Sequence, residues 1–248
     1  MFNFFNKKDK TTDSLALLPF DQDIHSHILP GIDDGAPDMH TSIQLIRGLY
    51  EMGIRKTIAT PHIIGDLYRN TPETIQAALD KTKRACEEAG INIEIRAAAE
   101  YMLDDHFMTL LTKNEPLLTL HKNLLLTELS YNLFPDNLHE MVFRIITHGY
   151  QPILAHPERY FYFHQDYDSF NRLKDLGFHL QVNLLSLTGY YGKEVAKAAV
   201  YIIKNGLAKL VGTDLHHMRH LNAIQQKRNI LIFKKYLGRK EWNADLGG

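Results

Sequence analysis

The chain has 248 residues and 44% hydrophobic content, which is enough for a core in one large domain or two small ones. Its 28 basic residues against 29 acidic ones leave a formal charge of -1, which excludes a basic surface for nucleic acid or a polybasic membrane patch. The single cysteine, Cys86, excludes an internal disulfide framework and fits a reducing compartment. No run approaches the roughly 20 apolar residues that span a bilayer, and the first residues lack a secretory pattern, so we expect a cytoplasmic protein.

The pattern along the chain predicts a flexible N-terminal extension, residues 1–18, followed by one domain, residues 19–248. In that domain short apolar or β-branched runs alternate with longer helical stretches. Strands are expected at residues 20–25, 56–60, 93–99, 124–128, 151–155, 178–183 and 209–212. Helices are expected at residues 41–52, 72–89, 141–148, in the stretch before Gly177, and at 194–205, and a glycine follows each of them.

Six of the seven predicted strands deliver a potential metal ligand at the same end. In chain order these are His25 with His27, His62, Glu100, Glu128, His156, and Asp214 with His216. In a closed parallel barrel the carboxyl ends of many strands meet, whereas an open sheet uses chiefly the strands around one switch point. We therefore expect an α/β fold of the TIM-like (β/α)7 barrel type.

The residue types at these strand ends indicate metal binding. His25 and His27 stand two apart, so both imidazoles can reach one cation. Glu100 and Glu128 end apolar strands, where a buried carboxylate is costly unless a cation or hydrogen bonds compensate it. Each histidine alone would more often be an ordinary loop residue, but the combination predicts a metal centre.

The number of donors predicts more than one ion. Eight or nine nitrogen and oxygen donors are too many for one divalent transition metal, which rarely takes more than about six ligands. Two or three divalent ions are expected, and mixed imidazole and carboxylate donors suit Mn, Fe or Zn. One division gives His25, His27 and Asp214 to a first ion, bridged by Glu100 to a second held by Glu128 and His156, and gives His62, His216 and Asp34, or Asp33 instead, to a third.

Such a centre predicts hydrolysis of phosphate esters. Two cations a few ångströms apart would acidify a bridging water to hydroxide and offset the charge of an attacked phosphate, so no protein nucleophile is needed. An arginine is the best donor to the phosphoryl oxygens, because its planar fork pairs with two of them. The candidates are Arg159, three residues beyond His156, and Arg219, three beyond His216. Weaker candidates for protonating the leaving group are His217, His220 and Asp66.

The order of the motifs resembles the PHP (polymerase and histidinol phosphatase) superfamily. It is more similar still to the capsule- and exopolysaccharide-associated, manganese-dependent tyrosine-protein phosphatases of bacteria. The motifs are DIHSHILPGIDDG (23–35), TPH (60–62), AAEY (98–101), LLLTEL (124–129), AHPER (155–159), QVN (181–183) and GTDLHH (212–217). The resemblance implies a distorted seven-stranded barrel of the PHP type with a trinuclear site and manganese as the metal.

The resemblance also implies a substrate and a ligand set. The substrate would be phosphotyrosine on a bacterial tyrosine kinase that controls polysaccharide export. Arg159 falls on the family's phosphate-binding arginine. The residues on its metal positions are His25, His27, Asp34, His62, Glu100, Glu128, His156, Asp214 and His216.

Other functions would need different sequence features. A cysteine phosphatase is excluded, because the position six residues after Cys86 holds Asn92 instead of an arginine. A small-molecule phosphatase of the same superfamily, such as a histidinol-phosphate phosphatase, stays open, and residues 63–70 would decide it. A binding module stabilised by saturated structural ions is the non-enzymatic alternative. Oligomers stay open too, since no heptad or apolar stripe stands out.

Overall fold

The computed structural model of the protein describes residues 17–238 and 240–244. Most of the predicted extension, residues 1–18, therefore lies outside the described residues. Its last two residues do not behave as an extension: the backbone amides of Leu17 and Leu18 both donate to the carbonyl oxygen of Met52, and Leu18 is buried. The folded domain thus includes Leu17 and Leu18, ahead of the predicted start at residue 19.

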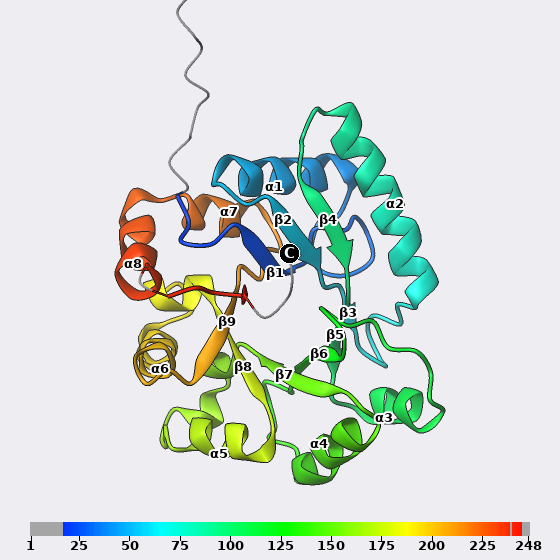
Figure 1. Ribbon diagram of the computed structural model, residues 1–248, viewed down its shortest axis with the longest axis vertical. Coiled ribbons are helices and arrows are strands. Elements are labelled where there is room, and N and C mark those ends of the chain that lie inside the picture. Colours follow the sequence, from blue (N-terminus) through cyan, green and yellow to red (C-terminus); the bar gives the residue numbers. More distant parts are fainter. Residues whose placement is uncertain (1–16, 239, 245–248) are drawn as a thin grey trace, which may run out of the picture.

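Within the described ranges, nine strands form two parallel sheets (Figure 1). The strands are β1 (Gln22–Ser26), β2 (Lys56–Ala59), β3 (His62–Ile63), β4 (Glu94–Ala97), β5 (Glu100–Met102), β6 (Leu124–Glu128), β7 (Gln151–Ala155), β8 (His179–Asn183) and β9 (Ala208–Gly212). The first sheet has the order β1-β2-β4 and the second the order β3-β5-β6-β7-β8-β9. Each of the seven predicted runs overlaps one of these strands.

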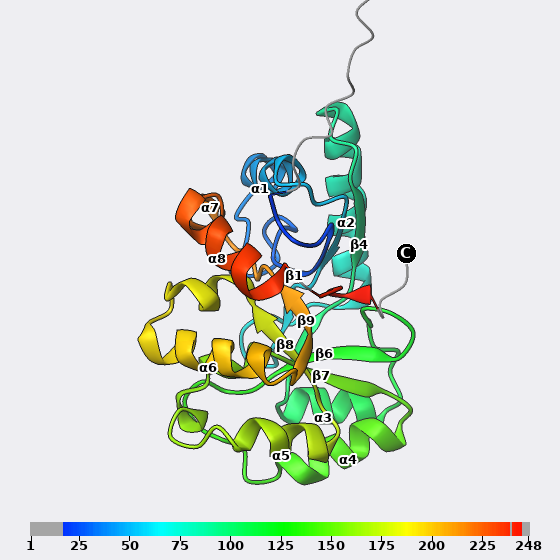
Figure 2. The same cartoon turned by 60° about the vertical axis from the view of Figure 1, so that its left-hand side comes forward.

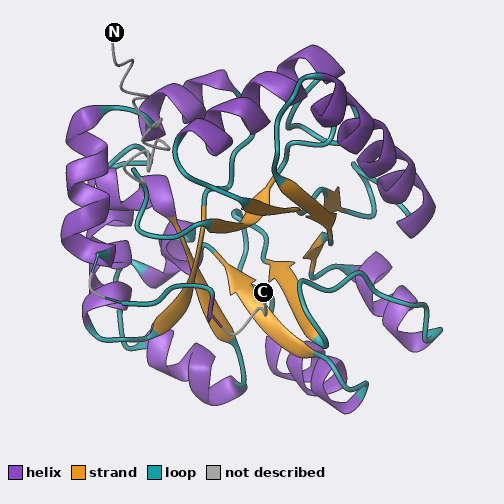
Figure 3. Cartoon of the chain, turned by 45° about the horizontal axis from the view of Figure 1, so that its top comes forward, coloured by secondary structure: helices purple, strands orange, loops and turns teal. Residues whose placement is uncertain are grey.

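Helices surround the strands on the outside of the molecule (Figures 1 and 3). They are α1 (Met39–Glu51), α2 (Pro72–Glu88), α3 (Asp105–Thr112), α4 (Leu138–Thr147), α5 (Ser169–Leu176), α6 (Lys193–Lys204), α7 (Met218–Ile224) and α8 (Lys227–Leu237). Five match predicted helices, whereas α3, α7 and α8 were not predicted. The turned view in Figure 2 shows α3, α4 and α5 together outside β6 and β7. None of the helices in the described part of the chain is long and apolar enough to cross a membrane.

The start of α2 shows how the local sequence determines where a helix begins. Thr71 and Thr74 form a reciprocal cap, in which each side-chain oxygen accepts from the other residue's backbone amide, and Pro72 occupies the first turn. Cys86 lies on the buried side of this helix. The inner face therefore packs on the core, and Cys86 is a packing residue there.

Two interruptions in the strands place predicted site residues opposite each other. The second run breaks at Thr60 and Pro61 and resumes as β3, and the third breaks at residues 98–99 and resumes as β5. Pro61 has no backbone N–H to continue a ladder. His62 then pairs with Glu100 across β3 and β5. These short strands were not predicted, and they hold both side chains on paired backbone.

β1 and β9 lie side by side without a ladder between them among the described strands. The amide of Asp214 donates to the carbonyl of His25 at 2.7 Å. The Asp23 carboxylate accepts from the backbone amide of Thr213 at 2.9 Å and from its hydroxyl at 2.6 Å. The structure is an α/β fold with parallel sheets, in which hydrogen bonds outside any ladder join β1 to the end of β9.

Asn243 bridges the same two strands with its side-chain amide. Its Oδ1 accepts from the amide of Val211 at 2.9 Å, and its Nδ2 donates to the carbonyls of Val211 at 3.0 Å and Gln22 at 2.9 Å. The residue is buried, with φ at 61°. One side chain thus supplies hydrogen bonds that a strand neighbour would otherwise make.

Asn243→Ala is expected to lower the free energy of unfolding by about 2–4 kcal/mol, because three hydrogen bonds are lost and buried backbone groups stay unpaired. Urea denaturation measures this loss. The control is Asn205→Ala, which removes one exposed bond to the carbonyl of Tyr201 and should cost about 0.5 kcal/mol or less. Equal losses in the two variants would show that Asn243 does not join β1 to β9.

Candidate metal centre

Glu100 stands at the centre of four imidazoles at the carboxyl ends of the strands. Its Oε2 lies 3.2 Å from His25 Nε2, 3.3 Å from His27 Nε2 and 3.2 Å from His62 Nδ1. Its Oε1 lies 3.1 Å from His156 Nε2. All five residues are buried. One carboxylate therefore gathers histidines from β1 and the residue after it, from β3 and from the segment after β7.

The nine predicted ligands come together in four overlapping groups, and the donor atoms of each group lie within 4.8 Å of one another. The groups are His25, His27 and Glu100; His25, His156 and Asp214; His62, Glu100 and Glu128; and His27, Asp34, His62 and His216. These groups differ from the predicted division: Glu128 lies 2.9 Å from His62, and His156 is grouped with Asp214. Spacing in sequence could not show which strand ends are neighbours.

Asp33 and Asp34, between which the sequence left the choice of ligand open, have different partners. Asp33 Oδ2 lies 2.8 Å from His27 Nδ1 and accepts from the amide of His62 at 3.2 Å. It therefore holds the His27 ring by the nitrogen that does not face Glu100. Asp34 Oδ1 lies 3.4 Å from His62 Nε2 and 3.6 Å from His216 Nε2. Asp34 is thus the carboxylate that reaches the cluster on its exposed side.

Amide side chains on β8 orient two of the cluster residues. Gln181 Oε1 lies 2.8 Å from His25 Nδ1, and Asn183 Nδ2 donates to Asp214 Oδ2 at 2.8 Å. Because Gln181 engages Nδ1 of the ring, Nε2 of His25 is the nitrogen left to face Glu100. Sequence reasoning assigned no role to these amides. Their only signal was the QVN motif within the family resemblance.

The backbone at the cluster contains left-handed conformations that the local sequence does not predict. His156 (φ 37°) and Asp214 (φ 51°) are non-glycine residues in the left-handed region, which costs free energy and is concentrated at functional sites. At Gly212 an added Cβ would lie 2.5 Å from the Cβ of His25. Only glycine lets β9 approach β1 this closely.

Burial and neighbouring charge move the pKa values of the cluster in opposite directions. Burial would raise the pKa of Glu100, yet the histidines around it, His25 first, hold that pKa well below its usual range. Burial and His27 would lower the pKa of His62, yet Glu100 and Glu128 raise it to about 9. Some imidazoles therefore hold protons that a bound cation would displace.

His62 Nδ1 lies 3.2 Å from Glu100 Oε2 and 2.9 Å from Glu128 Oε1, yet none of these three buried atoms makes a hydrogen bond within the described ranges. Such an unpaired buried group costs about 1–3 kcal/mol. A cation between the three atoms would satisfy all of them, and an imidazole with two carboxylates suits Mn, Fe or Zn. The residues present thus fit a metal ion.

Arg159 reaches the cavity that opens on the cluster. This cavity has a volume of about 440 Å³, and its lining includes Arg159, Tyr131 and Tyr191 beside six of the nine predicted ligands. Arg159 Nη1 donates to Asp214 Oδ2 at 2.6 Å. Sequence reasoning missed both tyrosines, since neither stands in a motif that marks it. A cation and a guanidinium group can therefore act on the same bound anion.

The weaker candidates are placed differently. Arg219 is exposed, lines a separate hollow with Tyr190 and is not among the residues that line this cavity. The reason is helical periodicity: His217 and His220, three apart at the start of α7, share the face that lines the cavity, and Arg219 lies on another. Asp66 is exposed and is not among the residues that line the cavity.

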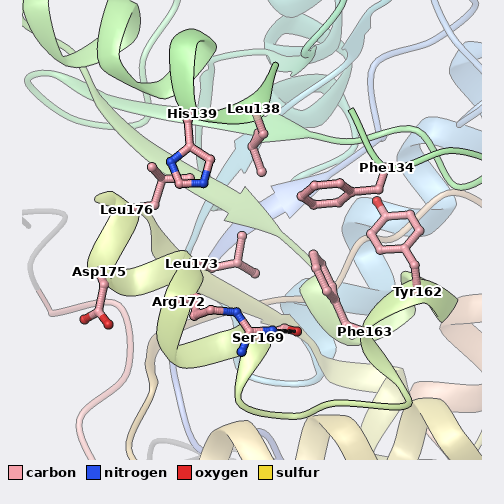
Figure 4. Close-up of a pocket in the computed structure, with 10 residues that line it drawn as sticks. All are labelled: Phe134, Leu138, His139, Tyr162, Phe163, Ser169, Arg172, Leu173, Asp175 and Leu176. Atoms are coloured by element: carbon pink, nitrogen blue, oxygen red, sulfur yellow. Dashed lines mark hydrogen bonds between the residues drawn. The ribbon is translucent and has the colours of Figure 1, made fainter. Parts of the chain in front are cut away.

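A larger apolar hollow, of about 790 Å³, lies between α4 and α5, away from the cluster. In Figure 4 Phe134, Leu138 and Leu173 gather in it, with Tyr162 and Phe163 at one side. None of the metal-type groups found among the described residues lies there. The chemistry thus belongs to the cavity at the strand ends.

Comparison with protein families assigns the chain to a known family. Residues 22–242 match the family model for capsular polysaccharide synthesis, CpsB/CapC. The chain belongs to this family. The family resemblance seen in the sequence motifs is confirmed. A curated relative, tyrosine-protein phosphatase YwqE of Bacillus subtilis (strain 168), is 28% identical over 214 residues, which are 86% of this chain and 84% of the relative.

Solved structures agree with the family. One of the crystal structures of YwqE from Bacillus subtilis and CpsB from Streptococcus pneumoniae, described as unique metal-dependent tyrosine phosphatases, matches with a TM-score of 0.78 and 27% identity over 88% of both chains. Histidinol phosphate phosphatase from Lactococcus lactis matches with a TM-score of 0.50 and 13% identity over 90% of this chain and 95% of that one. The second likeness concerns the fold alone.

Metal binding is expected to release protons and to strengthen as pH rises. Burial lowers the pKa values of His25, His27 and His62, but neighbouring carboxylates raise them above the ordinary value, that of His62 to about 9, and a proton on such a ring must leave before the ring can bind a cation. Mn affinity should therefore increase from about pH 6 to about pH 8, with at least about one proton released per protein. Titration calorimetry in buffers of different ionisation enthalpy counts these protons.

The control for this titration is His148→Asn, which removes an exposed histidine at the end of α4 and should leave the proton count unchanged. Mn affinity that stays constant over the same pH range would contradict the assignment of these imidazoles as ligands.

Proposed function

We propose that this protein is a metal-dependent tyrosine-protein phosphatase that acts in capsule or exopolysaccharide synthesis. The observation that carries the proposal is the buried Glu100 carboxylate among four imidazoles, two of which, His62 and His156, line a cavity that also holds Arg159. Membership of the CpsB/CapC family supports the substrate class. The surrounding residues give the centre an open side, as a catalytic site requires and a saturated structural site lacks.

The proposed centre holds two or three divalent ions, with Mn as the expected metal and Fe or Zn as alternatives. Glu100 offers two oxygens and belongs to two donor groups, so it suits a bridging position. The proposed ligands are His25, His27, Asp34, His62, Glu100, Glu128, His156, Asp214 and His216. When bound, such ions supply Lewis acidity that activates water and neutralises phosphate charge.

The chain's own residues have separate tasks in this proposal. Arg159 donates to the non-bridging phosphoryl oxygens, for which its planar fork is suited. Gln181 and Asn183 hold His25 and Asp214 in place. No protein side chain serves as a nucleophile.

The finer description of the fold also belongs to the proposal. If β2 with β3 and β4 with β5 each count as one interrupted strand, seven strands remain, as in a distorted barrel of the PHP type. Asp23 and Asn243 support closure between β1 and β9 through side chains. A bacterial tyrosine kinase as the substrate protein and a cytoplasmic location stay predictions from the sequence.

Chelation is expected to abolish hydrolysis of a phosphotyrosine peptide, and added Mn should restore it, because the buried donors need a cation. Phosphate release from this peptide is to be compared with release from histidinol phosphate, each with and without Mn. Preference for histidinol phosphate would favour the small-molecule phosphatase. A fully metallated protein that is inert toward both substrates would support the non-catalytic binding module.

Arg159→Ala is expected to raise KM for the phosphotyrosine peptide roughly ten- to hundredfold, because a charge-assisted contact to phosphate is lost. Metal content, measured by elemental analysis, should stay unchanged, since Asn183 still donates to Asp214. Arg219→Ala is the matched control and should leave KM as it is. If Arg159→Ala instead loses bound metal, Arg159 has a structural role.

A further inference from the structure

The guanidinium group of Arg159 lies between two tyrosine rings from distant parts of the chain. Its central carbon is 5.1 Å from the centroid of the Tyr131 ring and 4.5 Å from that of the Tyr191 ring. Its third contact is the ion pair to Asp214 Oδ2 at 2.6 Å. The Arg159 side chain is 22% exposed, so most of it is enclosed by these neighbours.

Both tyrosine hydroxyls are bonded to side chains of the metal cluster or next to it. Tyr131 Oη lies 3.3 Å from His156 Nδ1. Tyr191 Oη lies 3.4 Å from His220 Nε2 and accepts from Asn183 Nδ2 at 3.4 Å. Asn183 in turn donates to Asp214. Each ring is therefore placed relative to the cluster by its own hydroxyl, while its face is turned to Arg159.

We propose that Tyr131 and Tyr191 form a tyrosine clamp, which positions Arg159 to receive the phosphoryl group. The physical basis is twofold. The negative faces of the two rings attract the cation, and the enclosure removes rotamer freedom that a free arginine would lose on binding phosphate. The inference rests on the proposed function, because it takes Arg159 as the phosphate-binding residue.

The clamp makes Tyr131 and Tyr191 positioning residues that act through Arg159. The rings supply the contact to the guanidinium group, and the hydroxyls serve the scaffold. Removal of a ring should therefore weaken phosphate binding much more than removal of a hydroxyl. This difference separates the clamp from direct hydrogen bonding between a tyrosine and the substrate.

The test measures binding of inorganic phosphate to the Mn-loaded full chain by titration calorimetry. Tyr131→Leu and Tyr191→Leu should each raise Kd for phosphate roughly fivefold to tenfold, whereas Tyr131→Phe and Tyr191→Phe should stay within about twofold. Metal content should equal that of the wild type in all four variants. If a Leu variant does not fold, Met at the same position also removes the ring and offers a longer, unbranched side chain that adapts better to the gap.

A tyrosine outside the cavity lining provides a matched control. Tyr162 stacks on Tyr160 with its hydroxyl bonded to the carbonyl of Ser130. Tyr162→Leu should leave Kd for phosphate unchanged, whatever it does to thermal stability.

A double-mutant cycle decides whether the tyrosines act through Arg159. In the Arg159→Ala background, the further change Tyr191→Leu should have no added effect on Kd for phosphate. Additive losses would overturn the clamp, as would Phe variants as weak as the Leu variants. Wild-type protein that binds phosphate through Arg159 but hydrolyses no phosphotyrosine would refute the proposed function and leave the clamp standing. Unchanged Kd in the Leu variants of an active enzyme would refute the clamp alone.

Discussion

The burial of the Glu100 carboxylate among four imidazoles is the constraint on which the site depends. An uncompensated carboxylate in an apolar interior would cost several kcal/mol. Here its two oxygens lie within 3.3 Å of ring nitrogens from four histidines, and one of them still lacks a hydrogen-bond partner. Protons on the surrounding imidazoles compensate part of the buried negative charge, and bound cations would compensate the rest. The arrangement therefore favours metal binding over a neutral core.

Several backbone features allow this convergence. The breaks before β3 and β5 let His62 and Glu100 pair directly. Left-handed residues after β7 and β9 and the lack of a side chain at Gly212 bring the remaining ligands close. Strained conformations of this kind cost about 1–3 kcal/mol each, so they persist because surrounding contacts determine them. The stability of the domain and the geometry of the centre are thus coupled.

Asp214 links the metal cluster to phosphate recognition. One of its oxygens lies 3.4 Å from His25 Nε2, and the other accepts from Arg159 and Asn183. Displacement of Asp214 would therefore disturb both the ligand set and the arginine. The chain as a whole is almost neutral, so it has no long-range field to attract a phosphate. Attraction of the substrate therefore depends on a few enclosed charged groups at the site.

The sequence by itself determined the α/β alternation, the overlap of each predicted run with a strand, and the set of residues at the strand ends. Hydrophobic residues recur every 2 residues in a strand and every 3.6 in a helix, and burying a polar residue within an apolar run costs free energy. Both are properties of a local stretch of sequence. The Asp33-Asp34 pair could not be resolved in this way, since both residues follow the same strand. Tyr131 and Tyr191 carried no signal at all.

Only the tertiary structure decided which strand ends are neighbours, and so it grouped Glu128 with His62 and left Arg219 outside the cavity. It also showed that side chains of Asp23 and Asn243 join β1 to β9 where no ladder does. Distances between residues far apart in the chain depend on strand order, breaks and backbone twist. Those are set by packing of the whole domain, and no local window of sequence contains them.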